Sequence, residues 1–151
     1  MNNRHYTVCG IVEISGKVLL VRHTYGNAKN RILFPGGFVQ ENELPTVAVQ
    51  REIFEETGIA SKARSIIAMQ FKPEQWCAVF LMDYISGTPK SDGFENSEVL
   101  LLTPEEAVER DDITNMSREI LKAYIGEHSE LEESSYVPAS SDKGSYVIFG
   151  V

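Results

Sequence analysis

The sequence has few cysteines, a small share of basic residues and no long apolar run. Its two cysteines, Cys9 and Cys77, lie far apart without CxxC spacing, which argues against a disulfide scaffold or a zinc site. We expect buried thiols in a reducing compartment. No segment has the apolar length needed to cross a bilayer, and the first residues lack an apolar run after a basic start. We therefore expect a soluble, cytoplasmic protein without a membrane partner.

The scarcity of basic residues limits the partners further. Lys and Arg number 14 against 22 Asp and Glu, which gives a formal net charge of -8. Proteins that bind nucleic acid nonspecifically, or that bind anionic membranes, depend on basic patches, so we expect no nucleic-acid partner. An anionic substrate would need metal ions or a local Arg/Lys cluster.

The chain length of 151 residues fits one domain with a sizeable core. We predict a single domain over residues 1–127 and an acidic, polar tail over 128–151. The tail ends in the β-prone stretch "SYVIFGV", which predicts one added strand there. The same stretch is a candidate for pairing with a second copy, so a homodimer is one expectation.

The order of apolar patterns predicts a mixed sheet with helices packed on it, an α/β or α+β layered domain. Ser15-Gly16 separates two β-prone runs and predicts a hairpin, while Pro45 and Gly58 bracket a helix over Leu44–Thr57. Met116, Ile120, Leu121 and Tyr124 form a core-facing helical stripe. The predicted strands are 6–14, 17–24, 31–34, 63–71, 76–85 and 98–102, and the other predicted helices are 103–110 and 114–125.

The helix over Leu44–Thr57 concentrates negative charge. At about 100° per residue, Glu52, Glu55 and Glu56 fall on one face, where like charges one turn apart repel each other. Apolar residues occupy both flanks of this face and predict that it forms the floor of a cleft: Val47 and Phe54 on one side, Val49 and Ile53 on the other.

Two interpretations of the acidic face are open. Carboxylates without nearby His or Cys favour hard cations, and Mg²⁺ in particular binds through a few carboxylates, water and substrate phosphates. Acidic residues at this spacing are, however, most often a solvated helix face.

The surrounding pattern favours the metal site. The segment "GFVQENELPTVAVQREIFEETGI" resembles the Nudix box, the signature of the Nudix (MutT-like) hydrolases. The residues that occupy the expected places are Gly37, Glu43, Arg51, Glu52, Ile53, Glu55, Glu56, Gly58 and Ile59. The resemblance implies a Nudix-type α/β/α sandwich with a mixed β-sheet, in which the loop and helix of the box lie between layers.

The resemblance also implies a reaction. Enzymes with this box hydrolyse a nucleoside diphosphate linked to another group X, by attack of a metal-activated water on a phosphorus of the pyrophosphate. Carried over, Glu52, Glu55 and Glu56 would hold Mg²⁺ or Mn²⁺, with the Gly37 carbonyl as a further ligand. The base would be Glu52 or a carboxylate from a loop beyond the box, and the sequence leaves this choice open. Arg51 belongs to the catalytic set. Glu43 is its candidate partner for a bidentate contact, and the two residues would fix the geometry of loop and helix.

Residues beyond the box complete the expectation. Relatives often recruit another carboxylate from a later loop, and here Glu95 and Glu98 are candidates; we place Glu98 in the catalytic set because it precedes a strand. Both fit equally well as exposed loop acids. Arg22 and Arg31 are candidate phosphate contacts near strand ends, although exposed arginines are commonly plain surface.

The identity of X stays open among a nucleoside triphosphate, ADP-ribose, a dinucleoside polyphosphate and a nucleotide sugar. Tyr25, Phe38 and Trp76 are candidates for stacking on a base, although core packing is the commoner role of such residues, and His23 is equally ambiguous. One competing function is a nucleotide-sensing Nudix-like domain without turnover. Another is an enzyme that trims RNA ends, which the acidic balance disfavours.

Overall fold

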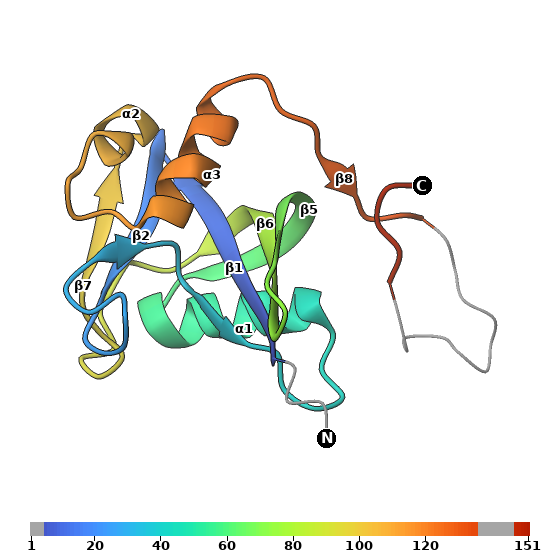
Figure 1. Cartoon of the computed structure of the whole chain (residues 1–151), viewed down its shortest axis with the longest axis horizontal. Coiled ribbons are helices and arrows are strands. Elements are labelled where there is room, and N and C mark those ends of the chain that lie inside the picture. Colours follow the sequence, from blue (N-terminus) through green and yellow to red (C-terminus); the bar gives the residue numbers. More distant parts are fainter. Residues whose placement is uncertain (1–4, 136–146) are drawn as a thin grey trace.

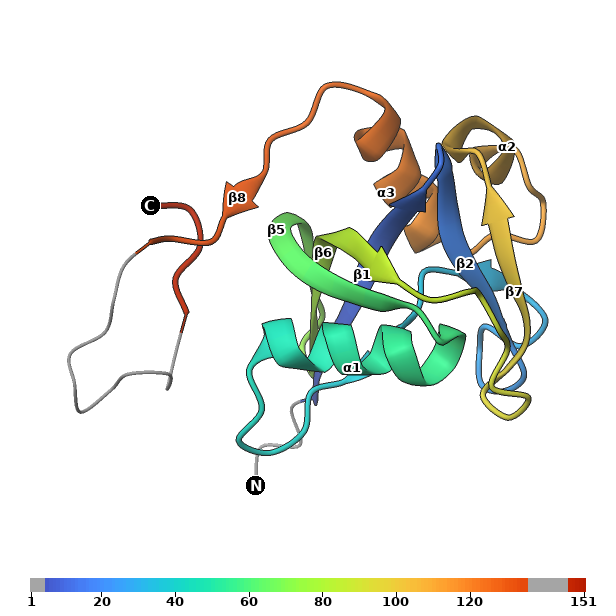
Figure 2. The same ribbon diagram turned by 180° about the vertical axis from the view of Figure 1, so that it is seen from behind.

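The computed structural model of the chain describes residues 5–135 and 147–151. A mixed sheet of strand order β3-β2-β1-β6-β5-β8 runs through the molecule, with β4 beside β1 and β7 beside β2 (Figures 1 and 2). β1 and β6 are parallel, and the other pairs are antiparallel. The strands are β1 (His5–Ile14), β2 (Lys17–His23), β3 (Ile32–Leu33), β4 (Gly36–Phe38), β5 (Ala60–Phe71), β6 (Gln75–Ser86), β7 (Asn96–Leu102) and β8 (Leu131–Glu132).

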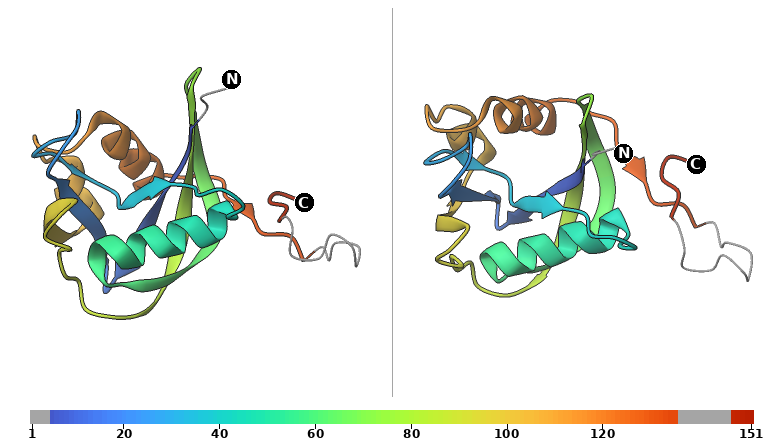
Figure 3. Two further views of the ribbon diagram at one scale, coloured as in Figure 1. Left: turned by 90° about the horizontal axis from the view of Figure 1, so that it is seen from below. Right: turned by 60° about the horizontal axis from the view of Figure 1, so that its bottom comes forward.

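Helices cover both faces of the sheet. α1 (Pro45–Thr57) lies on one face, and α2 (Pro104–Val108) and α3 (Asn115–Ile125) lie on the other (Figure 3). Successive side chains of a strand point to opposite faces, so Ile11 packs in the cluster that holds Leu121 of α3, and Val12 packs with Ile53 of α1. The predicted α/β/α sandwich with a mixed sheet is confirmed.

The local predictions at turns and helix ends are also confirmed. Ser15 and Gly16 both have positive φ, 52° and 79°, as a type I′ hairpin turn requires, and they join β1 to β2. Pro45 stands in the first turn of α1, and Gly58 ends the helix in the left-handed region with φ 73°. These two residues fix the length of the helix that carries the acidic face.

The prediction that α1 is buried along both flanks is wrong. Val49 and Ile53 are fully buried, but Val47 is 48% and Phe54 58% exposed. Only one flank contacts the sheet, because α1 is the outer layer on its face of the sandwich. The acidic face therefore borders both the sheet and solvent. In α3 the predicted stripe is confirmed, with Leu121 buried and Tyr124 packed against the same cluster.

The C-terminal segment adds contacts along the edge strand β5. β8 pairs with β5, Glu133 forms a bridge with Phe149, and the Phe149 ring lies edge-on to Phe80 at 5.9 Å between centroids. The strand expected over 145–151 falls partly outside the described residues, and the division at residue 127 stays a prediction. Among the helices of the described chain, none has the length and apolar character of a membrane span.

Candidate active site

α1 carries two glutamates, Glu52 and Glu56, on one face of the helix. Glu52 and Glu56 lie one turn apart, so their side chains leave the helix on the same face. Glu56 is 2% exposed, and the side chain of Glu52 is 12% exposed. The Thr57 hydroxyl donates to the Ile53 carbonyl at 2.6 Å inside the last turn. Two carboxylates are thus held on a rigid, largely buried surface.

A third carboxylate, that of Glu95, joins them from the loop before β7. One oxygen each of Glu52, Glu56 and Glu95 lie within 4.8 Å of one another. The loop is tied down at two points: the Asn96 side-chain amide donates to the Glu56 carbonyl at 2.8 Å, and the Thr24 hydroxyl donates to the Glu95 carbonyl at 3.1 Å. We call Glu52, Glu56 and Glu95 the acidic triad.

Glu56 is the most unusual member of the acidic triad. Its Oε2 atom is buried and has no hydrogen-bond partner within residues 5–135 and 147–151. Burial, followed by the charges of Glu52 and Glu95, raises its pKa to about 9, while a backbone hydrogen bond from Gly36 acts in the opposite direction. Burial also raises the pKa of Glu52, against the lowering effect of Arg51. A buried carboxylate without a partner is costly, and a bound cation would remove that cost.

Arg51 forms hydrogen bonds that hold Glu52 of the acidic triad in position. Its guanidinium donates to both carboxylate oxygens of Glu43 at 2.7 and 3.0 Å, to Glu52 at 2.9 Å and to the Phe38 carbonyl at 3.0 Å. These contacts link the loop after β4 to α1 and raise the pKa of Arg51 further above its usual range. The predicted pairing of Arg51 with Glu43 is confirmed.

Two glycines let the chain pass close to this group. A Cβ atom on Gly37 would lie 2.5 Å from the carboxylate carbon of Glu52, and one on Gly36 would lie 2.0 Å from the Val8 carbonyl oxygen. A side chain at Gly36 would push β4 away from β1, and one at Gly37 would displace the Glu52 carboxylate. The backbone of Gly37 therefore lies close to Glu52. The resemblance to the Nudix box predicts that the Gly37 carbonyl serves as a metal ligand beside this glutamate.

The other predicted acids are placed differently. The Glu55 side chain is 56% exposed, and its carboxylate accepts from Arg51 at 3.2 Å, outside the acidic triad. Glu98 faces Arg22 across the β2–β7 pair and accepts from it at 2.9 Å. The structure therefore brings Glu95, not Glu98, to the glutamates of α1. The sequence named both Glu95 and Glu98 as candidates, and the preference for Glu98 is wrong because Arg22 holds its carboxylate.

The two arginines predicted to contact phosphate are engaged elsewhere. Arg22 donates to Glu98, to Asp112 at 3.0 Å and to the Asn30 carbonyl at 2.8 Å. Arg110 also donates to Asp112, which completes a second charged group. We call Arg22, Glu98, Arg110 and Asp112 the balanced cluster. Arg31 donates to the Ile113 carbonyl.

A cleft of about 470 Å³ opens beside the acidic triad. Its floor comes from β1 and β6, and its rim comes from the loop after β2, from β4 and from the start of α3. Glu52 and Glu95 line it, and so do residues that the sequence did not single out as site residues: Thr7, Cys9, Asn27, Gln75, Cys77, Thr114 and Ser117. A cavity of this volume is typical of small-molecule sites.

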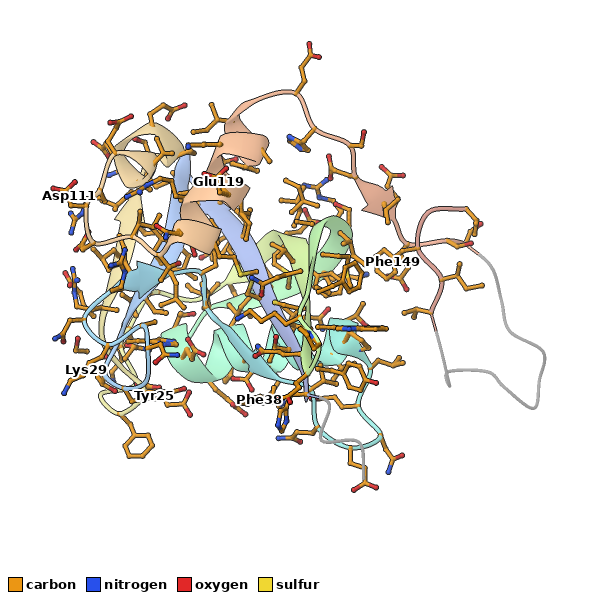
Figure 4. The ribbon with its side chains drawn as sticks, viewed as in Figure 1. Tyr25, Lys29, Phe38, Asp111, Glu119 and Phe149 are labelled. Atoms are coloured by element: carbon orange, nitrogen blue, oxygen red, sulfur yellow. The ribbon has the colours of Figure 1, made fainter. Side chains whose placement is uncertain are left out.

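The aromatic candidates are exposed, so the preference for core packing is wrong for them. Tyr25 is 54%, Phe38 59% and Trp76 41% exposed. Tyr25 and Phe38 line the cleft, as does His23, and Figure 4 labels the first two along the lower margin of the molecule. Trp76 lies instead in a separate apolar hollow with Tyr6 and Met69.

The chain matches the family model described as NUDIX domain over residues 1–124. It is 36% identical over 90 residues to an ADP-ribose pyrophosphatase of Methanocaldococcus jannaschii, which covers 56% of this chain and 53% of that protein. It is also 36% identical over 74 residues to the phosphatase NudJ of Escherichia coli, covering 49% and 45% of the two chains. The chain thus spans about half the length of the curated relatives it matches. A crystal structure of a NUDIX hydrolase from Nitrosomonas europaea superposes with a TM-score of 0.75 at 26% identity, over 83% of this chain and 72% of that one.

Proposed function

The chain belongs to the Nudix hydrolase family, and on that premise we propose that it is a metal-dependent hydrolase of nucleoside diphosphates linked to another group X. The bond cleaved is the pyrophosphate anhydride. The observation that supports this proposal best is the acidic triad, whose buried Glu56 oxygen has no partner within the described chain. We place the protein in the cytoplasm, where its free thiols would stay reduced.

The donor set fits a hard divalent cation. Carboxylate and carbonyl oxygens suit Mg²⁺ or Mn²⁺, and the acidic triad contributes no nitrogen or sulfur ligand. Glu52, Glu56 and Glu95 would hold the ion, with the Gly37 carbonyl as a further ligand. Such an ion lowers the pKa of water and screens the charge of phosphates during substitution.

The remaining roles follow from the contacts of each side chain. Glu52 would accept a proton from the attacking water, because it lines the cleft while its other contacts hold it in place. Arg51 and Glu43 would position Glu52 and the loop after β4 without touching the substrate. Glu55 stays a proposed ligand at the exposed end of the same face. Glu98 is left out of the proposal because Arg22 holds its carboxylate.

The test is product analysis with a matched control. Purified protein and Mg²⁺ are incubated with ADP-ribose, NADH, nucleoside triphosphates, dinucleoside polyphosphates and nucleotide sugars, and products are separated by chromatography. Glu56→Gln should abolish turnover of whichever substrate is cleaved. Glu119→Gln, which removes one charge from an exposed position of α3 (Figure 4), should not.

Two outcomes would overturn the proposal. Nucleotide binding without cleavage of any compound would favour a nucleotide-sensing domain without turnover. Turnover that persists in Glu56→Gln would mean that the acidic triad is not the catalytic site.

A further inference from the structure

The cleft beside the acidic triad has little positive charge of its own. Among the described residues that line it, none is a lysine or an arginine. Its ionisable lining consists of the carboxylates Glu52 and Glu95, the imidazole of His23, the Tyr25 phenol and the thiols of Cys9 and Cys77. Burial lowers the pKa of His23, which favours the neutral ring at neutral pH. Phosphate charge in this cleft would therefore be offset by bound cations and not by side chains.

The arginines around the site do not add positive charge to the lining of the cleft. Arg51 directs its donors at Glu43, Glu52, Glu55 and the Phe38 carbonyl. Arg22 belongs to the balanced cluster, and Arg31 is bonded to the Ile113 carbonyl. A substrate phosphate would have to break contacts of Arg51 or Arg22 to gain their charge. Arg31 keeps further donors, but it lines a separate hollow outside the cleft.

One wall of the cleft offers a flat, neutral surface instead. The rings of His23 and Tyr25 stack with centroids 5.2 Å apart and an interplanar angle of 13°. Tyr25 is 54% exposed, so part of its ring is accessible to a ligand in the cleft that both residues line; Figure 4 labels Tyr25 at the lower margin of the molecule. Aromatic surfaces of this kind bind planar or ring-shaped groups through stacking and apolar contact.

We propose that the cleft selects a diphosphate esterified at both ends, whose second group X is an uncharged ring that lies against His23 and Tyr25. This inference rests on the proposed function and narrows its substrate class. A doubly esterified diphosphate carries about two negative charges, a doubly esterified triphosphate about three, and a nucleoside triphosphate with a free terminal phosphate about four at neutral pH. The last two place additional charge next to Glu52 and Glu95 with no side-chain cation to receive it.

The first test is a charge series with one nucleoside. The value of kcat/KM is measured for ADP-ribose, diadenosine triphosphate and ATP at the same free Mg²⁺ concentration. We expect each added charge to lower kcat/KM about tenfold, because repulsion between unit charges is considerable in a partly buried cleft. Equal values, or a preference for ATP, would overturn the inference while leaving the proposed hydrolase intact.

The second test adds the missing cation. Asn27 lines the cleft beside Tyr25, and Asn27→Arg should raise kcat/KM for ATP at least fivefold relative to that for ADP-ribose. Asn27→Gln is the matched neutral control and should leave the ratio unchanged. If Asn27→Arg does not change the ratio in favour of ATP, side-chain charge does not set the selectivity and the inference fails.

The third test removes the aromatic surface. Tyr25→Ala should raise KM for ADP-ribose about tenfold with kcat nearly unchanged, whereas Tyr25→Phe, which keeps the ring, should stay within twofold of the native KM. A KM unaffected by Tyr25→Ala would contradict the placement of X. Cleavage of none of the three compounds, in contrast, would count against the proposed function itself.

Discussion

Two groups of charged side chains lie near the start of β7, one with Glu95 and the other with Glu98, and they differ in how their charge is balanced. In the balanced cluster, Arg22 and Arg110 face Glu98 and Asp112, and each carboxylate has a cationic partner within 3.0 Å. In the acidic triad, Glu56 has no ion-pair partner among the described residues, and one of its oxygens has no hydrogen-bond partner there. Paired charges of the first kind stabilise a fold modestly, whereas a buried carboxyl group without a cationic partner supports the cation site that we propose.

The largest expected effect breaks the acidic triad. Glu56→Gln keeps the shape of the side chain but removes the charge that would hold the ion, so kcat should fall by a factor on the order of 10³. The same substitution in the balanced cluster, Glu98→Gln, should change kcat less than threefold. Steady-state kinetics on the best substrate measures kcat for both variants. Equal losses of kcat would contradict the view that the acidic triad, and not the balanced cluster, is the catalytic site.

Arg51 and Arg110 provide the second contrast. Arg51→Ala leaves Glu43 and Glu52 without their common partner, so kcat should fall about 10- to 100-fold, as for residues that orient metal ligands. Arg110→Ala removes a comparable bond pair to Asp112 and should leave kcat within threefold. Weaker Mn²⁺ binding in Arg51→Ala would separate a positioning role from a purely structural one, which would lower only the melting temperature.

In the metal-free protein, burial of Glu56 should lower the free energy of unfolding at high pH. The folded-state pKa of Glu56, about 9, lies above the unfolded value, so its contribution is favourable at low pH and is lost as pH rises from about 4.5 to 9. Glu56→Gln should therefore raise the melting temperature at pH 8 by about 5 °C in the presence of a chelator, and by less at pH 5. A melting temperature lowered at both pH values would contradict the assignment.

The smallest effect belongs to the balanced cluster, with the opposite pH dependence. Arg22 and Arg110 hold the pKa of Asp112 well below its usual range, so its contribution is present above the unfolded pKa and is lost as pH falls toward the folded one. Arg22→Ala should lower the melting temperature at pH 7 by about 2–4 °C. Activity should stay within threefold, and a large rise in KM would restore Arg22 as a phosphate contact.

The helix of the site was predictable because its signals are local. Pro45 and Gly58 mark its ends, and the spacing of Glu52 and Glu56 places them on one face whatever the rest of the fold does. Arg51 and Glu43 are likewise close in sequence, and their pairing was predicted correctly.

The other components depend on contacts between distant segments. Glu95 reaches α1 because Asn96 bonds the Glu56 carbonyl and Thr24 bonds the Glu95 carbonyl, and neither contact has a pattern in the sequence. The register of β2 and β7 pairs Glu98 with Arg22, which decided against the residue that sequence favoured. The exposure of Tyr25 in the loop after β2 and of Phe38 at the end of β4 depends on tertiary structure, since composition alone favours burial for aromatic side chains.

The most direct measurement of the central claim is the binding of Mn²⁺, followed by the loss of the free-ion signal in electron paramagnetic resonance. The native protein and Glu98→Gln should bind Mn²⁺ with equal affinity, and Glu56→Gln should bind it at least tenfold more weakly. Equal binding by Glu56→Gln and the native protein would contradict the account, because the acidic triad would then not be the cation site.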